Sequence, residues 1–168
     1  IERVDCGGGL GIAYRDEIAP APAALAGAIK AELGALGLPV MLEPGRWIAG
    51  PAGVLLSRVI LQKQGAARRF VVLDAAMNDL LRPTLYEAHH AIWPIAPPQP
   101  SIGKADIVGP VCETGDYLGL DRDMPDLTNG DALAVMSAGA YGAVMASSYN
   151  SRSPAAEVMV LDGEAYLL

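Results

Sequence analysis

The chain has 168 residues, of which 52% are hydrophobic and 18% charged, and its formal net charge is −7. This composition favours a folded core over disorder, and the acidic balance argues against nucleic acid or an anionic membrane surface as a partner. No apolar run reaches the roughly 18 residues of a membrane span, and the two cysteines, Cys6 and Cys112, are too few for a disulfide framework. A reducing compartment, the cytoplasm, is the expected location.

The first 52 residues predict a strand, a helix and a second strand. IERVDC (residues 1–6) is typical of a buried strand, and it ends at three consecutive glycines. The segment 21–37 has apolar residues at helical spacing, with Gly37 as a C-cap and Pro39 just beyond it. PVMLEPG (39–45) predicts the second strand. A βαβ unit of this length indicates a parallel sheet or barrel. The apolar residues of the helix are Leu25, Ile29, Leu33 and Leu36.

After Gly53 the pattern becomes mostly β. Residues 54–64 and 68–74 are β-rich runs on either side of GAA, which predicts a hairpin. The proline-rich stretch WPIAPPQPS (93–101) predicts an extended surface loop. The chain is therefore predicted to consist of an α/β part, residues 1–52, and a β part, residues 53–168. Further short strands are expected within residues 104–112, 131–137 and 157–168.

Two loops suggest a phosphate site. A glycine-rich loop between a strand and a helix can offer backbone N–H groups to an anion. Neither named nucleotide motif is complete, however, because no G-K-[ST] follows and Ile12 stands where the dinucleotide motif needs glycine. A plain tight turn is an equal alternative. Glu43 and Arg46 in EPGRW (43–47) form a predicted acid–base pair at the end of the next strand, or a simple surface ion pair.

Five motifs, in order, run from residue 7 to residue 152. They are GGGLG (7–11), EPGR (43–46), MNDLLRPTLYEAHH (77–90), GPVCETGDYLG (109–119) and GAYGAVMASSYNSR (139–152). In these motifs the sequence resembles the C-terminal part of the diaminopimelate decarboxylase family. These are fold-type III pyridoxal-phosphate enzymes related to ornithine and arginine decarboxylases and, more distantly, to alanine racemase. NSRSPAAEV departs slightly from the family's NSRPRPAEV, after the catalytic motifs.

The resemblance implies a fold and an oligomeric state. Residues 1–52 would be the last βα units of an alanine-racemase-like (β/α)8 TIM barrel that binds pyridoxal 5'-phosphate, and residues 53–168 a C-terminal β-sandwich or β-barrel domain. The enzyme would be a homodimer whose active sites are shared across the interface. The resemblance also implies an anchor lysine early in the family's chain. Of the lysines present, Lys30, Lys63 and Lys104, none is placed for that role, so this chain looks like a fragment without the N-terminal half and is expected to be inactive alone.

The resemblance also assigns roles to individual residues. Glu43 would face the pyridine nitrogen of the cofactor, and Tyr141 would close over it. Cys112 would be the catalytic proton donor, supplied with Glu113 by the neighbouring subunit. The implied cofactor-binding residues are Gly7, Gly8, Gly9, Glu43, Gly45, Arg46 and Tyr141. The implied substrate-binding residues are Arg46, Arg82, Tyr86, Glu113 and Tyr141.

Plainer interpretations stand beside these roles. Without the resemblance, Arg82 is more typical of a solvated loop arginine and Cys112 of a small buried hydrophobe, and Tyr141 is compatible with ordinary turn packing. Cys6 is expected in the core. No metal site is expected, because the adjacent His89 and His90 should point apart; both are interpreted as structural, with His90 near the site.

Three functions remain open from the sequence. The first, favoured by the resemblance, is decarboxylation of meso-2,6-diaminopimelate to L-lysine with pyridoxal phosphate. The second is decarboxylation of another basic amino acid, such as ornithine, arginine or a carboxylated polyamine. The third is a non-catalytic module that binds a phosphate ligand. Arg82 separates the first two, because diaminopimelate has a second carboxylate to bind and ornithine does not.

Overall fold

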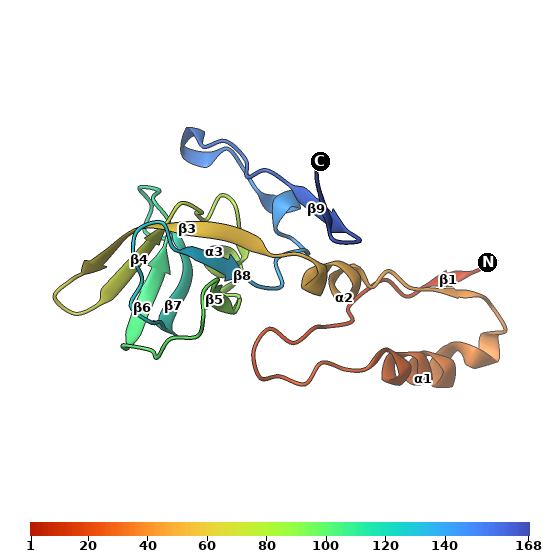
Figure 1. Ribbon diagram of the computed structural model, residues 1–168. Helices are drawn as coiled ribbons and strands as arrows, with labels where there is room; N and C mark the ends of the chain where they lie inside the picture. Colours follow the sequence, from red (N-terminus) through yellow and green to blue (C-terminus); the bar gives the residue numbers. More distant parts are fainter.

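The computed structural model describes all 168 residues. Residues 1–52 extend away from a curled sheet formed by the middle of the chain (Figure 1). This N-terminal arm contains β1 (Val4–Asp5), α1 (Pro22–Leu33), a 3-10 turn (Gly34–Leu36), β2 (Val40–Met41), α2 (Gly45–Ala49) and a second 3-10 turn (Gly50–Ala52). None of the helices is long and apolar enough to cross a membrane.

The predicted βαβ unit is present, although its strands are short. β1 and β2 pair in parallel, with Val4 opposite Val40. The predicted helix ends where expected, because Gly37 has a left-handed φ of 64° after the 3-10 turn. The apolar stripe of α1 is only partly buried. Cys6 is exposed rather than in the core, because a two-stranded sheet with one helix leaves much of its surface uncovered.

The middle of the chain forms one six-stranded mixed sheet with the order β5-β8-β3-β4-β6-β7. β4 and β6 are parallel, and the other neighbours are antiparallel. The sheet curls so far that its edges approach, since a Cβ on Gly119 of β7 would lie 3.1 Å from Ile92 of β5. The strands are β3 (Leu55–Gln64), β4 (Arg69–Leu73), β5 (Ile92–Pro94), β6 (Lys104–Val108), β7 (Tyr117–Asp123) and β8 (Ala132–Val135).

Most of the predicted β runs are confirmed, among them the hairpin of β3 and β4 around residues 65–68. Three features differ from the prediction. β7 lies in a run for which no strand was predicted. β5 includes Trp93 and Pro94 of the expected proline-rich loop, which is possible because β5 is an edge strand. The last predicted strand is an antiparallel hairpin of β9 (Val158–Leu161) and β10 (Glu164–Leu167), and all of its strand residues are exposed.

The hydrophobic core belongs to the curled sheet. Leu73, Ile107, Leu118 and Leu133 are fully buried, and apart from Leu10 every buried hydrophobic residue lies between Val59 and Ala140. The short helix α3 (Arg82–Tyr86) contacts β7. The core therefore fixes the loops that lead into and out of α3.

Candidate functional site

A cavity of about 640 Å³ lies where the N-terminal arm meets α3. It collects four of the predicted site residues: Arg46 from α2, Arg82 and Tyr86 from α3, and Tyr141 from the loop after β8. Residues that the sequence interpretation did not place there complete its lining, namely Tyr14, Glu17, Ala88, His89 and Met145.

Arg82 is the most constrained of these side chains. It is 6% exposed, so the interpretation as a solvated loop arginine is wrong. Its Nη1 lies 2.9 Å from Nε2 of His90, and its guanidinium lies over the ring of Tyr14 at 4.6 Å from the centroid. No carboxylate lies within 4.0 Å of it. A buried cation is normally paired, and this guanidinium has no counter-charge within the chain.

The local sequence explains how α3 presents Arg82. Pro83 is tolerated in the first turn of the helix, because a backbone N–H there would have no acceptor within the helix. Glu87 ends the helix with a left-handed φ of 51°. Arg82 and Tyr86 are four residues apart, one helical turn, and so lie on the same face towards the cavity.

The two histidines after α3 contact different arginines. Nδ1 of His89 lies 3.0 Å from the carbonyl oxygen of Tyr14, and its Nε2 contacts Arg122. Burial and the positive charge of Arg122 lower the pKa of His89, and burial followed by the charge of Arg82 lowers that of His90. Adjacent histidines therefore point apart, as predicted. The structure assembles no group of three or more His, Cys, Asp or Glu side chains that could hold a metal ion.

The glycine loop packs directly on the EPGR corner. The N–H of Glu43 donates to the carbonyl oxygen of Gly7 at 2.8 Å, and a Cβ on Gly8 would lie 2.5 Å from the carbonyl oxygen of Glu43. Gly7 and Gly9 have left-handed φ values of 66° and 88°. This close approach and these φ values require bare backbone, which explains the glycines of the triplet.

The backbone donors of the loop are not equivalent. The N–H of Gly7 is already used, because it donates to Oδ1 of Asp5 at 2.8 Å. The N–H groups of Gly8 and Gly9 donate to no group of the chain. Two unpaired donors on an exposed loop that packs on the EPGR corner suit the phosphate of pyridoxal phosphate, so the residues present fit that cofactor.

The predicted Glu43–Arg46 ion pair does not form. Arg46 lies in the first turn of α2, and its guanidinium lies over the ring of Tyr141 at 5.7 Å from the centroid. Tyr141 has a left-handed φ of 60° in the GAYG turn and is 44% exposed. The turn therefore presents the Tyr141 ring to the arginine and the cavity, which goes beyond turn packing.

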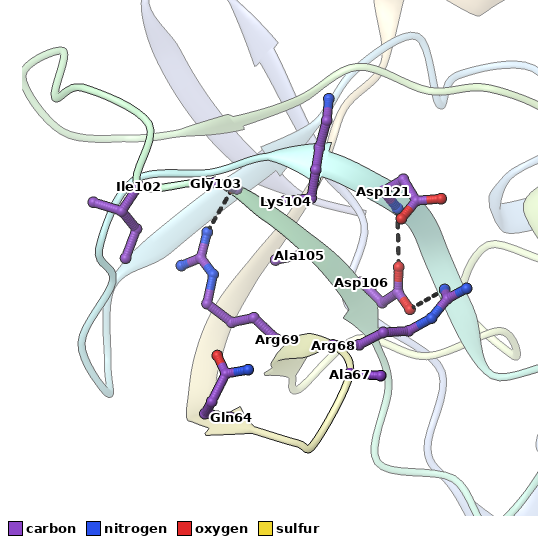
Figure 2. A pocket seen from close by; sticks show the side chains of 10 residues that line it. All are labelled: Gln64, Ala67, Arg68, Arg69, Ile102, Gly103, Lys104, Ala105, Asp106 and Asp121. Atoms are coloured by element: carbon purple, nitrogen blue, oxygen red, sulfur yellow. Dashed lines mark hydrogen bonds and ion pairs between the residues drawn. The ribbon is translucent and has the colours of Figure 1, made fainter.

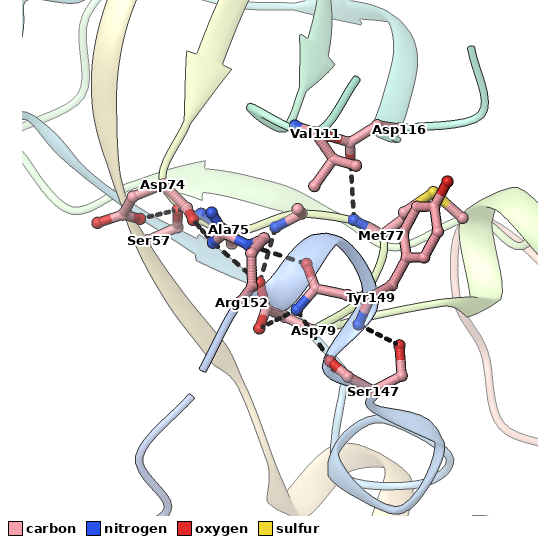
Figure 3. Close-up of polar contacts among 12 residues, drawn as sticks. Ser57, Asp74, Ala75, Met77, Asp79, Val111, Asp116, Ser147, Tyr149 and Arg152 are labelled. Atoms are coloured by element: carbon pink, nitrogen blue, oxygen red, sulfur yellow. Dashed lines mark hydrogen bonds and ion pairs between the residues drawn. The ribbon is translucent and has the colours of Figure 1, made fainter. Parts of the chain in front are cut away.

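Cys112 and Glu113 lie outside this cavity. Both are exposed on the loop between β6 and β7, so Cys112 is not a buried hydrophobe. Oε2 of Glu113 lies 3.4 Å from the hydroxyl of Tyr149. Asp116 anchors this loop: its carboxylate accepts hydrogen bonds from the N–H of Met77 at 2.7 Å and of Val111 at 2.6 Å (Figure 3).

The end of the GAYG motif segment is tied to the start of the MNDLLRP segment. Nε of Arg152 donates to Oδ1 of Asn78 at 3.0 Å, and its Nη2 forms an ion pair with Asp79 at 3.6 Å. Figure 3 shows Arg152 beside Asp79, although the two residues lie on loops far apart in sequence. The polar residues of three motifs thus hold one another in place and fix the segment that carries Arg82.

A second cavity, of about 310 Å³, lies on the sheet and is also rich in cations (Figure 2). There Arg68 pairs with Asp106 at 2.8 Å, Lys104 pairs with Asp123, and Arg69 donates to the carbonyl oxygens of Gly103 and Met124. These cations are satisfied inside the chain, in contrast to Arg82. The cavity at α3 is therefore the better candidate site.

None of the three lysines lines the cavity at α3. Lys30 lies on α1, Lys63 on β3 and Lys104 on β6. Sequence reasoning missed Tyr14, whose carbonyl oxygen and ring contact His89 and Arg82 respectively. Its only signal was its position three residues after the glycine motif.

The sequence matches the family described as "Pyridoxal-dependent decarboxylase, C-terminal sheet domain" over residues 17–139. Among curated proteins, the diaminopimelate decarboxylase of Neisseria meningitidis serogroup A / serotype 4A is 51% identical over 168 residues, which is 100% of this chain and 41% of that protein. The chain thus spans about two fifths of the length of the curated relatives it matches.

Solved structures agree with the sequence matches. A crystal structure of AQ1208 from Aquifex aeolicus has a TM-score of 0.95 at 47% identity, covering 99% of this chain and 42% of that one. Diaminopimelate decarboxylase from Helicobacter pylori complexed with L-lysine has a TM-score of 0.91 at 42% identity, covering 98% and 41%. The chain is similar to these proteins throughout its length.

Proposed function

Because this chain belongs to the pyridoxal-dependent decarboxylases, whose C-terminal sheet domain it contains, we propose that the whole protein converts meso-2,6-diaminopimelate to L-lysine. Pyridoxal phosphate is the cofactor of the family. The whole protein would act in the cytoplasm, where the exposed free thiols of Cys6 and Cys112 stay reduced.

The unpaired guanidinium of Arg82 carries this proposal. It is buried, has no carboxylate partner and lines a cavity that also contains Arg46. A planar guanidinium binds a carboxylate with two parallel hydrogen bonds. Diaminopimelate offers a carboxylate at the end that does not react, which ornithine lacks. The substrate carboxylate would therefore supply the negative partner that Arg82 lacks inside the chain.

The arm would hold the cofactor. Gly8 and Gly9 would donate their free N–H groups to its phosphate, and Glu43 would face its ring nitrogen. When bound, pyridoxal phosphate supplies an electron sink for the electron pair left after loss of CO2. Gly7 would shape the loop rather than donate, since its N–H is used by Asp5. The remaining cofactor contacts would come from Gly45, Arg46 and Tyr141.

Cys112 and Glu113 would act in the site of a partner subunit. Both are exposed and lie outside the cavity of their own chain, which is what a site shared across a homodimer requires. Sγ of Cys112 would deliver the proton that replaces CO2, and the carboxylate of Glu113 would bind the distal ammonium. Tyr86 and Tyr141 would line the substrate's position.

The arm would belong to the barrel. β1 and β2 are parallel neighbours connected through α1, as in a (β/α)8 barrel. We place the last βα units of that barrel at residues 1–52 and the sheet domain at 53–168, and we place the anchor lysine in the part of the longer protein that precedes this chain.

Turnover by the full-length enzyme tests the proposal. Loaded with pyridoxal phosphate, it should release CO2 and form L-lysine from meso-diaminopimelate, with kcat/KM at least about a hundredfold above that for ornithine or arginine, because an unfilled Arg82 is costly. Equal or better turnover of ornithine would favour the basic amino acid alternative. Cofactor binding without any turnover would favour a binding module.

Mixing subunits tests the shared site. A Cys112→Ala subunit and a subunit with its anchor lysine replaced should each be inactive. After subunit exchange, a mixed dimer has one intact site of two, so about a quarter of wild-type activity should return at equal mixing. No recovery after verified exchange would place Cys112 in the site of its own subunit.

A further inference from the structure

His90 is a fully buried polar residue without an assigned role, 0% exposed between α3 and β5. Its ring contacts two groups. Nδ1 lies 2.8 Å from the carbonyl oxygen of Met136, and Nε2 lies 2.9 Å from Nη1 of Arg82. The ring of Tyr14 meets it edge-on at a centroid distance of 5.2 Å.

These contacts determine the protonation of the imidazole. A carbonyl oxygen only accepts, so Nδ1 must carry a proton and donate it to Met136. The guanidinium of Arg82 only donates, so Nε2 must be unprotonated and accept. Both contacts form together only in the neutral ring with its proton on Nδ1.

We propose that His90 is a positioning residue for substrate binding: as a neutral acceptor it fixes the guanidinium of Arg82 against Tyr14, with its other donors free for the substrate carboxylate. This inference rests on the proposed role of Arg82. The five N–H donors of Arg82 exceed what His90 can accept, and no other hydrogen bond of the chain uses them.

A residue that only fills the core would not need this arrangement. An apolar side chain could fill the same space, and it would make no hydrogen bond with Arg82. Here the acceptor is matched to the one buried arginine that lines the cavity. Without the acceptor, Arg82 would lose its only hydrogen bond and could adopt other rotamers.

The charges around His90 oppose its protonation. Arg82 from α3, and His89 and Arg122 from the neighbouring loop and β7, all act on it as positive or protonatable groups, and burial is the largest effect. Tyr14 of the arm adds no charge at neutral pH. The pKa of His90 is thereby held below its ordinary value of 6.5. Protonation at lower pH would place a proton on Nε2 facing the guanidinium and remove the contact.

Two variants of the full-length holoenzyme separate the ring's contacts. In His90→Gln, the amide reaches the position of Nε2 and can accept from Arg82, whereas in His90→Asn it reaches only the position of Nδ1. We expect His90→Asn to raise the KM for meso-diaminopimelate roughly 10- to 100-fold, as for loss of a hydrogen bond to a charged group, with a smaller change in kcat. His90→Gln should recover most of that loss. Equal effects of both variants, or a loss of kcat alone, would overturn the proposal.

The pH profile gives a second measurement. The wild-type KM should be flat at neutral and higher pH and rise only below pH 6.5, as His90 protonates, because Nε2 can then no longer accept. His90→Gln does not titrate there, so its KM should stay flat down to the same pH. A rise of equal size in His90→Gln would assign the effect to another group and overturn the proposal. Circular dichroism and a thermal melt confirm that each variant is folded.

A third measurement does not depend on the substrate. With ¹⁵N-labelled histidine in the holoenzyme, the His90 resonances should show a proton on Nδ1 and an unprotonated Nε2 at pH 7, and Arg82→Ala should shift Nε2. If this pattern is present but the enzyme does not turn over diaminopimelate, the proposed function fails while the contact stands. The opposite tautomer would refute the positioning role, whatever the substrate is.

Discussion

The arm and the sheet region hold their functional groups in different ways. In residues 1–52, nearly every side chain is at least partly exposed, and the glycine loop is fixed by one backbone hydrogen bond from Glu43 and by the left-handed φ values of Gly7 and Gly9. In residues 53–140, Arg82 and His90 are buried beside a hydrophobic core. Backbone geometry thus forms the proposed phosphate site, whereas side-chain packing forms the proposed carboxylate site.

This difference predicts that the two sites can be damaged separately. A substitution in the sheet region should change substrate binding and leave the cofactor in place. A substitution in the glycine loop should do the reverse. Tyr14 of the arm and His89 of the sheet region are joined by a hydrogen bond of 3.0 Å. A change that breaks this hydrogen bond should therefore slightly weaken both cofactor binding and substrate binding.

The largest effect is expected from Arg82→Ala in the full-length enzyme. It would leave a charged substrate group unpaired, at a cost of about 2–5 kcal/mol. At roughly 1.4 kcal/mol per tenfold, kcat/KM for diaminopimelate should fall on the order of 30- to several-thousand-fold. Steady-state kinetics measures this loss, and a cofactor titration should show little change.

Arg82→Lys is the matched variant for charge. It keeps the positive charge but not the planar fork, so it should recover only part of the loss. Near-normal turnover in Arg82→Ala, or loss of the cofactor instead, would show that this arginine is misassigned and would favour the basic amino acid alternative.

An intermediate effect is expected from Gly8→Ala. The new methyl group would lie 2.5 Å from the carbonyl oxygen of Glu43, and overpacking of this kind costs about 1–3 kcal/mol. The affinity of the full-length apoenzyme for pyridoxal phosphate should therefore fall roughly 5- to 150-fold. The KM for the substrate at saturating cofactor should stay close to that of the wild type.

Gly11→Ala is the control for this prediction, because a Cβ on Gly11 meets nothing within 4 Å and its φ is not left-handed. It should bind the cofactor like the wild type. Equal losses in the two alanine variants would mean that the loop depends on general flexibility rather than on the approach to Glu43.

The smallest effect concerns pH and stability. Burial lowers the pKa of His89 and His90 below 6.5 in the folded state. Between the folded value and 6.5, the unfolded chain binds more protons, so the free energy of unfolding should decrease as the pH falls below 6.5 and be insensitive to these groups above it. Urea unfolding across this range measures the slope, and His90→Gln should reduce it. An unchanged slope would show that His90 does not contribute.

Hydrophobic patterning predicted the fold where packing is regular. The β3–β4 hairpin is confirmed because two β-rich runs on either side of a short turn pair with each other, and the parallel pairing of β1 and β2 is confirmed because a helix connects the two strands. β7 was missed because its sequence, Tyr117–Asp123, contains a glycine and three charged residues, which are uncommon in strands. The strand lies at the edge of the sheet. Cys6 was placed in the core because a strand pattern cannot show how many neighbours the strand has.

Motifs predicted four residues of the cavity, Arg46, Arg82, Tyr86 and Tyr141. They could not predict contacts between motifs. That Gly7 uses its N–H on Asp5, and that Arg46 meets Tyr141 rather than Glu43, depends on dihedral angles and on tertiary geometry. The roles of these four residues, like those of the glycine loop, Cys112 and Glu113, stay predictions.

The two hydrogen bonds of Asp116 have a consequence for anyone who redesigns this protein. One carboxylate joins the loop that carries Cys112 to the loop that leads to Arg82, and a Cβ on Gly109 would lie 2.5 Å from its Oδ1. The structures of two segments about 40 residues apart in sequence therefore depend on each other. Grafting a relative's CETGD loop to change substrate choice should succeed only when its MND segment is transplanted with it.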